Sequence, residues 1–489
     1  GFIIVYPCRF MPARQSIGPG MSSQLSHMPE RRHDVVVIGG GSAGYAAART
    51  ARDAGADVAI VDQGPLGGLC ILRGCMPTKT ILRSAEIIAL MKRAREFGLS
   101  PVTAQADLSA IVDRKNRLVQ EFADYRIAAL RDPRFTLYES RAEFLSPHEL
   151  RAGDVRIRGG AFVIATGSSA AEVAIPGLDE AGYLTSDEML DIRRQPASLL
   201  VLGGGLVAVE FAQFFARIGT KVTMLQRSTT LLSDMDEDIS QALAAAFQDE
   251  GIEVMTGVSF QRVSSTPSEK TVHFVQGGAV HTRSAEVIFQ ALGRRPNLKG
   301  LNLKVAGVCV VDGRLVVGGD MRTSQPHIFA VGDVNDLTPI VHLAIEQGET
   351  AGFNATHPNE PARVIDHRLD TEVVFTEPQV AVAGMSERQC REEAIPYLTA
   401  SYPFADHGKA MCLGAVHGFV KLLCRPDDGA LLGAQIVGPE AGELIHELIA
   451  VMYFHGTAQD LLRIPHYHPT LAEIVTYPAE SIVEQMGRA

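Results

Sequence analysis

The chain lacks any run of 18 consecutive apolar residues, whereas a transmembrane helix needs about 20. We therefore expect no membrane-spanning segment. Basic residues are not in excess, since the formal net charge is -11, and this argues against nucleic acid as a partner. The histidines and cysteines form no cluster with zinc-site spacing, so we expect no bound metal.

Cysteine is scarce as well. The seven cysteines are scattered and odd in number, which does not resemble the disulfide framework of a secreted domain. A reducing, cytoplasmic compartment is the better interpretation. A length of 489 residues, with 46% of them hydrophobic, predicts about three domains with large cores. Residues 1–33 are predicted to be a disordered extension, with a transit peptide as the alternative.

Residues 34–62, DVVVIGGGSAGYAAARTARDAGADVAIVD, have the pattern of a strand, a glycine-rich turn, a helix and a second strand. Gly39, Gly41 and Gly44 follow the spacing GxGxxG. In such a motif the first glycine permits the tight turn and the second lets the backbone approach a pyrophosphate at the helix N-terminus. The third lets helix and strand pack closely. This segment therefore predicts a dinucleotide site.

Residues 198–228 repeat the pattern, with Gly203, Gly205 and Ala208 at the corresponding positions. One such motif is weak evidence, because glycine-rich turns are common. Two copies, each between a strand and a helix, are much stronger evidence. The chain is therefore predicted to bind two dinucleotides.

The two motifs differ where the second strand ends. Asp62 follows Gly39 by 23 residues, whereas Gln226 follows Gly203 by the same 23, with Arg227 next. An acid accepts hydrogen bonds from a ribose 2′-OH and would repel a 2′-phosphate, whereas Gln beside Arg favours the phosphate. The first site thus suits FAD and the second favours NADPH over NADH. An ordinary surface role for Arg227 is the alternative.

Cys70 and Cys75 lie just downstream, in GGLCILRGCMPTK. A disulfide needs Cα atoms within about 7 Å, yet side chains at i and i+5 of a regular helix point apart. The backbone must therefore bend between them, which Gly74 allows, and Pro77 suits the first turn of a following helix. We interpret the two cysteines as a redox pair beside a bound dinucleotide, with unrelated core cysteines as the alternative.

The rest of the chain alternates between helical and strand patterns. Residues 80–130 predict two helices, and residues 162–169, 287–297 and 323–336 each contain a buried strand that ends in a turn. From residue 361 onward the pattern changes to antiparallel strands with a few helices. This last region is predicted to be an assembly domain.

Six ordered motifs, GxGxxG, CxxxxC, ATG, a second GxGxxA, FAVGD and HYHPTLAE, together resemble the class I pyridine nucleotide–disulfide oxidoreductases. The resemblance implies an α/β fold with two Rossmann-like dinucleotide-binding domains and an α+β dimerisation domain. The FAD domain would comprise residues 34–180 and 296–358. The NAD(P) domain would be 181–295, and residues 361–489 would form a homodimer. The implied cofactors are FAD and NADP or NAD.

The resemblance also implies roles for individual residues. Cys70 matches the thiol that attacks the substrate disulfide, and Cys75 matches the thiol nearest the flavin. Lys79 and Glu210 match an ion pair beside the flavin, where charge develops on reduction. The further implied cofactor contacts are Gly68, Thr166, Gly167, Asp333 and Gly293. Asp333 matches the acid that binds the ribityl chain of FAD, with a helix N-cap as the alternative.

His468 and Glu473 match the family motif HPTxxE. There the histidine is the acid–base group of the other subunit's disulfide site, and the glutamate orients it. Thr470 and Glu473 also fit a capping box. His466 is interpreted as a wall residue.

The motifs leave the substrate open. Leu69, Leu72 and Arg73 depart from the family's usual cysteine motif, and Arg73 is either a solvated helix residue or a substrate contact. Residues 212–228 resemble mercuric reductase, whereas HPTLAE resembles lipoamide dehydrogenase. We expect dihydrolipoamide or a protein-bound lipoyl group as substrate. The alternative is an NADPH-dependent reductase of a small disulfide such as glutathione, a quinone or a metal ion. A non-catalytic interaction subunit is a third interpretation.

Overall fold

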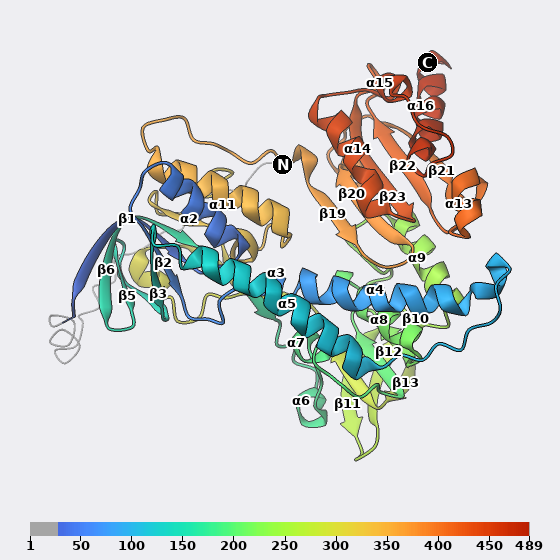
Figure 1. The fold of residues 1–489 in the computed structure, drawn as a ribbon, viewed down its shortest axis with the longest axis horizontal. Helices are drawn as coiled ribbons and strands as arrows, with labels where there is room; N and C mark the ends of the chain where they lie inside the picture. The colour runs from blue at the N-terminus through green and yellow to red at the C-terminus, as the bar shows by residue number, and fades with distance from the viewer. Residues whose placement is uncertain (1–27, 489) are drawn as a thin grey trace. The chain divides into compact units, whose positions relative to one another are not determined.

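The structure, a computed structural model, describes residues 28–488, which divide into two compact units (Figure 1). Unit 1 comprises residues up to 77, 117–171 and 294–365. Unit 2 comprises residues 78–116, 172–293 and those from 366 onward. Most of the predicted N-terminal extension, up to residue 27, lies outside the described residues.

Unit 1 is built on a seven-stranded sheet of order β3-β2-β1-β6-β5-β4, with β18 also paired to β6. Its strands are β1 (Glu30–Ile38), β2 (Val58–Asp62), β3 (Phe135–Glu139), β4 (Ala142–Ser146), β5 (Glu149–Ala152), β6 (Val155–Ile164) and β18 (Ile328–Ala330). The strands β3, β2, β1, β6 and β18 run parallel, whereas β4 and β5 are antiparallel additions. The parallel strands are nearly continuous buried apolar runs, as expected of a sheet covered on both faces.

The strand β1 begins at Glu30, four residues before the start that the apolar pattern predicts. Residues 30–33 pair in register with residues 156–159 of β6. The segment ERRH has no apolar residue, so periodicity gives no signal there. A cross-strand ion pair between Glu30 and Arg156, at 2.5 Å, accompanies the pairing. The predicted extension therefore does not reach residue 33.

The helices α2 (Ser42–Asp53) and α11 (Val341–Thr356) lie side by side in unit 1 (Figure 1). Five alanines of α2 are buried, and their small side chains allow close helix packing. The remaining elements that lie in or extend into unit 1 are α3 (Leu69–Leu72), α4 (Cys75–Lys92), α5 (Leu108–Leu130), β7 (Ser168–Ala170), β15 (Arg294–Pro296), α10 (Leu303–Ala306), β16 (Val310–Val311), β17 (Arg314–Leu315) and η2 (Gly332–Asn335). The two long helices α4 and α5 confirm the prediction for residues 80–130.

Unit 2 contains a parallel four-stranded sheet of order β10-β9-β8-β14 and an antiparallel three-stranded sheet of order β11-β12-β13. The elements of this part are η1 (Ala94–Phe97), α6 (Leu178–Ala181), α7 (Ser186–Met189), β8 (Ser198–Leu202), α8 (Leu206–Ile218), β9 (Lys221–Leu225), α9 (Glu237–Asp249), β10 (Glu253–Met255), β11 (Ser259–Ser265), β12 (Lys270–Gln276), β13 (Ala279–Ala285) and β14 (Val287–Gln290). The second strand–turn–helix–strand repeat is therefore present, as the sequence predicts.

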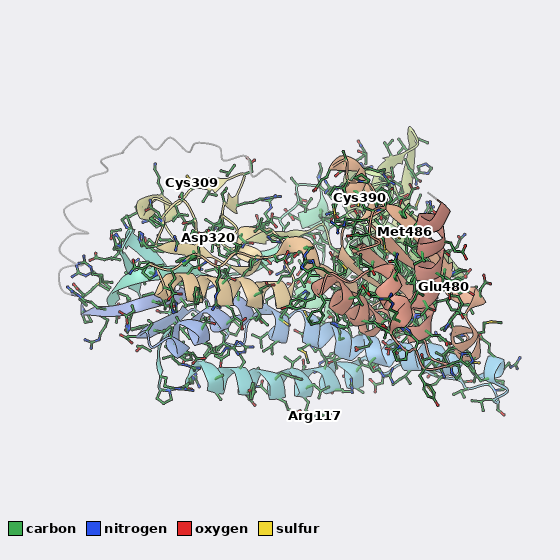
Figure 2. The ribbon with its side chains drawn as sticks, turned by 90° about the horizontal axis from the view of Figure 1, so that it is seen from above. Arg117, Cys309, Asp320, Cys390, Glu480 and Met486 are labelled. Atoms are coloured by element: carbon green, nitrogen blue, oxygen red, sulfur yellow. The ribbon has the colours of Figure 1, made fainter. Side chains whose placement is uncertain are left out.

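Residues after 366 form an antiparallel five-stranded sheet of order β19-β20-β23-β22-β21 with flanking helices. These elements are η3 (His367–Leu369), β19 (Thr371–Val374), β20 (Gln379–Gly384), α12 (Glu387–Glu392), β21 (Leu398–Pro403), η4 (Phe404–Asp406), α13 (Gly408–Leu413), β22 (Phe419–Cys424), β23 (Leu431–Gly438), α14 (Ala441–Tyr453), α15 (Ala458–Arg463), η5 (Ala472–Val475) and α16 (Thr476–Arg488). Glu480 and Met486 lie on α16 (Figure 2). This mixed α/β architecture confirms the predicted fold class.

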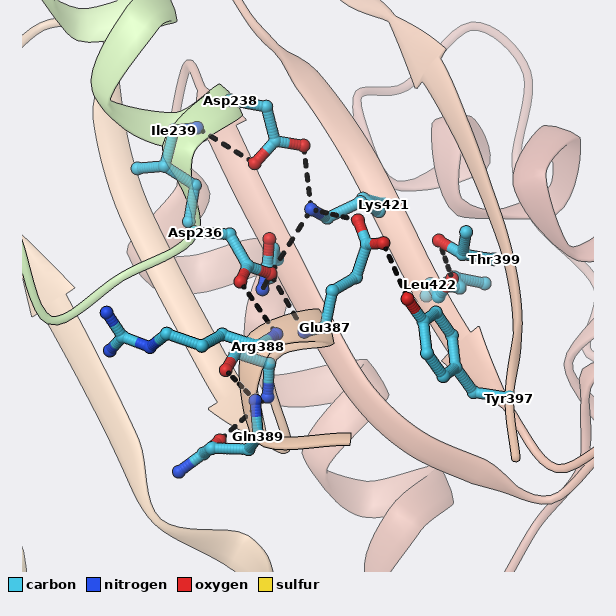
Figure 3. A network of polar contacts seen from close by, with 12 residues as sticks. Asp236, Asp238, Ile239, Glu387, Arg388, Gln389, Tyr397, Thr399, Lys421 and Leu422 are labelled. Atoms are coloured by element: carbon cyan, nitrogen blue, oxygen red, sulfur yellow. Dashed lines mark hydrogen bonds and ion pairs between the residues drawn. The ribbon is translucent and has the colours of Figure 1, made fainter. Parts of the chain in front are cut away.

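A buried lysine connects the start of α9 to the five-stranded sheet (Figure 3). Lys421 on β22, only 3% exposed, donates to Asp238 at 2.7 Å, Glu387 at 3.0 Å and Asp236 at 3.3 Å. Gln435 also donates to Asp236, at 2.6 Å. Hydrogen bonds from Gln435 and backbone amides, with the charge of Lys421, outweigh burial and lower the pKa of Asp236. The network keeps a buried charge fully paired.

Candidate functional site

The first glycine-rich turn has the backbone that a phosphate group requires. Gly39 adopts φ +103°, and Gly41 is the extended N-cap residue of α2. A Cβ on Gly44 would lie 1.9 Å from the Gly39 carbonyl oxygen, so only glycine fits there. The N-terminus of α2 is open, since a Cβ on Gly41 would meet only the Gly68 Cα, at 3.8 Å.

Asp62, the last residue of β2, lies beside this turn. Its Oδ2 accepts a hydrogen bond from the Gly40 amide at 2.6 Å, and its Oδ1 accepts one from the Gly64 amide at 2.7 Å. Charge-assisted bonds of this kind are the stronger ones. The carboxylate is therefore held in a fixed position next to the helix N-terminus, where a ribose would lie in a dinucleotide complex.

The cysteine segment is packed against the same turn. Gly68 has φ +81°, and a Cβ there would lie 2.7 Å from the Gly41 Cα. After it, α3 carries Cys70, and the chain bends at Arg73 and Gly74 before α4 begins at Cys75. The predicted bend is therefore present. Pro77 lies in the first turn of α4, as expected.

Cys75 is exposed, whereas Cys70 is partly buried. The hydrogen bond to the Cys75 sulfur raises the pKa of the Cys70 thiol, and burial raises it further. The Cys70 thiol is therefore harder to ionise than a free cysteine. A base has to remove its proton before Cys70 can attack a disulfide.

Arg126 on α5 is a charge near Cys70 that the sequence gives no reason to single out. Its positive charge lowers the pKa of Cys70, against the larger effect of Cys75. The guanidinium lies 4.5 Å from the ring centroid of Tyr45. Its Nη1 is buried and has no hydrogen-bond partner within residues 28–488. Only the tertiary structure shows that this helical arginine is near the thiol pair.

Asp333 lies inside η2, whose N-cap residue is Val331, so the N-cap alternative is wrong. Its Oδ2 accepts a hydrogen bond from Ser168 Oγ at 2.6 Å. Arg294 in turn donates from Nε to Ser168 Oγ and from Nη2 to the Ser168 carbonyl, both at 2.8 Å. Ser168 is thus a direct partner of Asp333, and Arg294 holds Ser168 in place; the sequence motifs point to neither residue.

The ATG turn is fixed by a single asparagine. Thr166 Oγ1 donates to the Asn297 carbonyl at 2.8 Å, and Asn297 Nδ2 donates to the Thr166 carbonyl at 3.0 Å. The Asn297 amide also donates to the carbonyl of Gly167, at 2.9 Å. Thr166 and Gly167 are therefore held at the end of β6, in the same unit as Asp62 and the cysteine pair.

In unit 2, the second glycine-rich turn repeats the backbone of the first. Gly203 has φ +121°, and Gly205 is the extended N-cap residue of α8. Ala208 is 1% exposed, so its methyl group is accommodated where Gly44 has no room for one. Gly293, at φ +108°, directly precedes β15.

Gln226 and Arg227 follow β9, at the position that corresponds to Asp62. Gln226 is 8% exposed, and its Nε2 donates to the Thr230 carbonyl at 3.4 Å. Arg227 is exposed. The end of this strand therefore has a cation and a neutral amide, where the first motif has a carboxylate.

Lys79 on α4 and Glu210 on α8 form an ion pair in unit 2. The Lys79 ammonium donates to both carboxylate oxygens at 2.9 Å. Glu210 is 5% exposed and also accepts a hydrogen bond from the Phe375 amide at 3.0 Å. The Lys79 nitrogen lies 4.4 Å from the ring centroid of Phe375. A buried carboxylate with these partners is not a plain surface charge, so the two motif residues act together.

His468 and Glu473 are also brought together. His468 Nδ1 lies 2.9 Å and 3.1 Å from the two carboxylate oxygens of Glu473. The His468 side chain is 80% exposed, whereas that of Glu473 is 14% exposed. With Nδ1–H directed at the carboxylate, Nε2 is the nitrogen that can accept a proton.

The capping-box alternative for this segment is wrong. The short helix η5 has Leu471 as its N-cap residue, with no side-chain cap. Thr470 Oγ1 is buried and has no hydrogen-bond partner in the described part of the chain. The Glu473 carboxylate is therefore used by His468 rather than by the helix terminus.

His466 is held by Glu447 of α14, with Nε2 at 2.8 Å from Oε1. Its side chain is 8% exposed. It lines a mainly apolar groove of about 800 Å³, together with residues such as Phe454, Ile464 and Tyr467. This position is consistent with the predicted wall role.

The residues of unit 1 fit FAD. They offer an open helix N-terminus, a carboxylate fixed beside it and a second carboxylate at Asp333. Residues 28–488 hold no group of three or more His, Cys, Asp or Glu side chains placed to bind an ion. No described helix has both the length and the apolarity to cross a bilayer.

Comparisons with known proteins agree with these motifs. The family model described as pyridine nucleotide-disulphide oxidoreductase matches residues 33–348, and the model of its dimerisation domain matches residues 371–479. A mercuric reductase of Staphylococcus aureus is 33% identical over 95% of this chain and 85% of its own length. A dihydrolipoyl dehydrogenase of Bacillus subtilis is 32% identical over 93% of this chain and 99% of its own. The Cu(II) complex of the HOCl-induced flavoprotein disulfide reductase RclA from Escherichia coli superposes with a TM-score of 0.82 at 27% identity, covering 92% and 99% of the two chains.

Proposed function

Because the chain belongs to the class I pyridine nucleotide–disulfide oxidoreductases, we propose that it passes electrons between NAD(P)H and a disulfide or dithiol through the Cys70–Cys75 pair. The observation that carries this proposal is the hydrogen-bonded thiol pair on a segment packed against the first glycine-rich turn. FAD, when bound, supplies the two-electron carrier between nicotinamide and disulfide. The dimerisation domain supports a homodimer, and the scattered cysteines favour the cytoplasm.

The chain's own groups would manage the proton and the charge. His468, oriented by Glu473, would take the Cys70 proton through Nε2, so that the Cys70 thiolate can attack the substrate disulfide. The Lys79–Glu210 pair would supply fixed charge near the flavin. The family resemblance assigns His468 to the disulfide site of the other subunit.

Dihydrolipoamide or a protein-bound lipoyl group is the substrate we favour. The His468–Glu473 pair supports it, because a dithiol substrate has to lose protons at this site. The second candidate is NADPH-dependent reduction of a small disulfide, a quinone or a metal ion. The exposed Arg227 supports NADPH, and the relatives named mercuric reductase support a metal-ion substrate.

The thiol assignment can be tested by absorbance spectroscopy of the flavin-loaded protein. Two-electron reduction should produce a long-wavelength charge-transfer band from the Cys75 thiolate. Cys75→Ser should abolish it, and Cys70→Ser should show it without reduction. Cys412→Ser, which changes an exposed cysteine on α13, is the matched control and should behave as wild type. A Cys75→Ser protein that keeps the band would contradict the assignment.

The substrate can be tested by steady-state assays. Dihydrolipoamide is assayed with NAD⁺ or NADP⁺, and glutathione disulfide and Hg²⁺ are assayed with NADH or NADPH. The highest kcat/KM should be found with the lipoyl substrate. Fastest turnover of glutathione disulfide or Hg²⁺ would favour the second candidate. No turnover of any of them in a flavin-loaded protein would favour a non-catalytic role.

A further inference from the structure

His407 is a buried histidine that neither the motifs nor the proposed chemistry uses. It lies between η4 and α13 and is 1% exposed. Its Nδ1 has no hydrogen-bond partner in residues 28–488. Its Nε2 also makes no hydrogen bond of good geometry within these residues, but it has one polar neighbour at 3.5 Å. Leaving a buried polar group unpaired costs about 1–3 kcal/mol, so an apolar residue would be the more stable choice at this position.

The neighbour of Nε2 is the carboxylate that would orient His468. His407 Nε2 lies 3.5 Å from Glu473 Oε1, while His468 Nδ1 contacts the same carboxylate at 2.9 Å and 3.1 Å. Glu473 therefore lies between two imidazoles. One is exposed and can meet a substrate, and the other is enclosed in the protein.

The surroundings keep His407 neutral. Burial lowers the pKa of His407, against the opposing effect of Glu473. The ring is edge-on to Tyr477 of α16, with centroids 6.2 Å apart, and Tyr477 stacks on Tyr402 of β21. The titratable groups that face it are thus Glu473 of η5, His468 just before η5 and the phenol of Tyr477. A neutral imidazole facing a carboxylate presents Nε2–H to it and leaves Nδ1 unprotonated.

We propose that His407 is a positioning residue of the proton-transfer site, which holds the Glu473 carboxylate through Nε2–H and thereby orients His468. When the Cys70 S–H bond breaks and an N–H bond forms at His468, the resulting imidazolium faces a carboxylate that is already held in place. The S–H bonding pair stays on sulfur and the Nε2 lone pair forms the new N–H bond, so the step changes no oxidation state. The inference rests on the proposed function of His468.

The test is a double-mutant cycle read by substrate turnover. His407→Leu removes the donor at similar volume, and His407→Gln keeps an N–H donor. We expect His407→Leu to lower kcat/KM for disulfide reduction about tenfold, since small misplacements of a catalytic group are costly. Its pH profile should shift to a lower apparent pKa, because a carboxylate that is no longer held in place stabilises the imidazolium less. His407→Gln should recover most of the activity.

In a Glu473→Gln background, His407→Leu should cause no further loss. Reduction of the flavin by NAD(P)H and the flavin content should remain at the wild-type level. Tyr477→Phe, which keeps the neighbouring ring, is the matched control and should leave the pH profile unchanged. If His407→Leu does not fold, His407→Met takes its place in the cycle.

Three results would overturn the inference: an unchanged rate and pH profile in a flavin-loaded His407→Leu protein, an apparent pKa that rises, or losses that add in the Glu473→Gln background. A failure of the proposed function is distinguishable from these. In that case His468→Gln itself would keep its disulfide turnover, whereas we expect it to lose about 100-fold.

Discussion

The two glycine-rich turns have nearly the same backbone, yet their surroundings differ. Gly39 and Gly203 have φ of +103° and +121°, and their amides donate to the second strand at 2.8 Å and 2.9 Å. Gly41 and Gly205 both start a helix in an extended conformation. The shared backbone suits a phosphate group in both turns, so it cannot by itself decide which nucleotide binds.

The differences lie in two side-chain positions. The helix α2 packs so close to its turn that Gly44 cannot carry a Cβ, whereas α8 accepts Ala208. The strand β2 ends at Asp62, whose carboxylate accepts hydrogen bonds from two backbone amides. The strand β9 is followed instead by the buried side chain of Gln226 and the exposed side chain of Arg227. Selectivity between cofactors is therefore expected from these positions.

Exchanging the third positions of the two turns should have the largest effect. Gly44→Ala places a Cβ 1.9 Å from the Gly39 carbonyl oxygen. It should destabilise unit 1 by about 3 kcal/mol, at the upper end of overpacking costs, and release FAD. Ala208→Gly should cost only about 1 kcal/mol, mostly through helix propensity. Flavin content and thermal unfolding of the two variants measure this, and equal behaviour would contradict the packing difference.

Asp62→Asn should weaken FAD binding next most strongly. The substitution removes the charge and turns an acceptor into a donor that faces an amide. Charge-assisted hydrogen bonds contribute about 1.5–3 kcal/mol each, so flavin affinity should fall at least tenfold. A titration of the apoprotein with FAD would measure the change. Gln226→Asn is the matched variant in the second motif and should leave flavin affinity as it is.

Gln226→Glu combined with Arg227→Ala should give the second motif a carboxylate and no cation at the end of its second strand, as in the first motif. We expect wild type to prefer NADPH, and the double variant to shift the ratio of kcat/KM values toward NADH by about ten- to a hundredfold. This range corresponds to one charge-assisted contact of about 1.5–3 kcal/mol. A wild type that favours NADH would show that Arg227 is an ordinary surface residue, and would strengthen the lipoamide dehydrogenase assignment.

The smallest expected effect is that of salt. Raising ionic strength from about 0.15 M to 1 M shortens the Debye length from about 8 Å to 3 Å. Because Arg227 is exposed, KM for NADPH should rise a few-fold more than KM for NADH. Arg227→Ala should remove the difference. The same salt dependence in wild type and variant would exclude this contact.

The sequence by itself determined the elements whose chemistry is local. Gly39, Gly41 and Gly44 sit between an apolar strand and a helix, and such a turn is encoded by a few neighbouring residues. The bend at Gly74 follows in the same way from the geometry of a disulfide, and the helices at residues 80–130 follow from their periodicity. The start of β1 was missed because residues 30–33 have no apolar pattern and depend on β6 for pairing.

Only the tertiary structure decided which distant residues meet. Glu473 fits a helix cap and a catalytic pair equally well in sequence, and the structure assigns its carboxylate to His468, with His407 behind it. Arg126 and Ser168 likewise look ordinary until folding brings them to Cys70 and Asp333. The contacts of His407 with Glu473, of Arg126 with Cys70 and of Ser168 with Asp333 join residues that lie far apart in the chain, and short-range patterns carry no information on them.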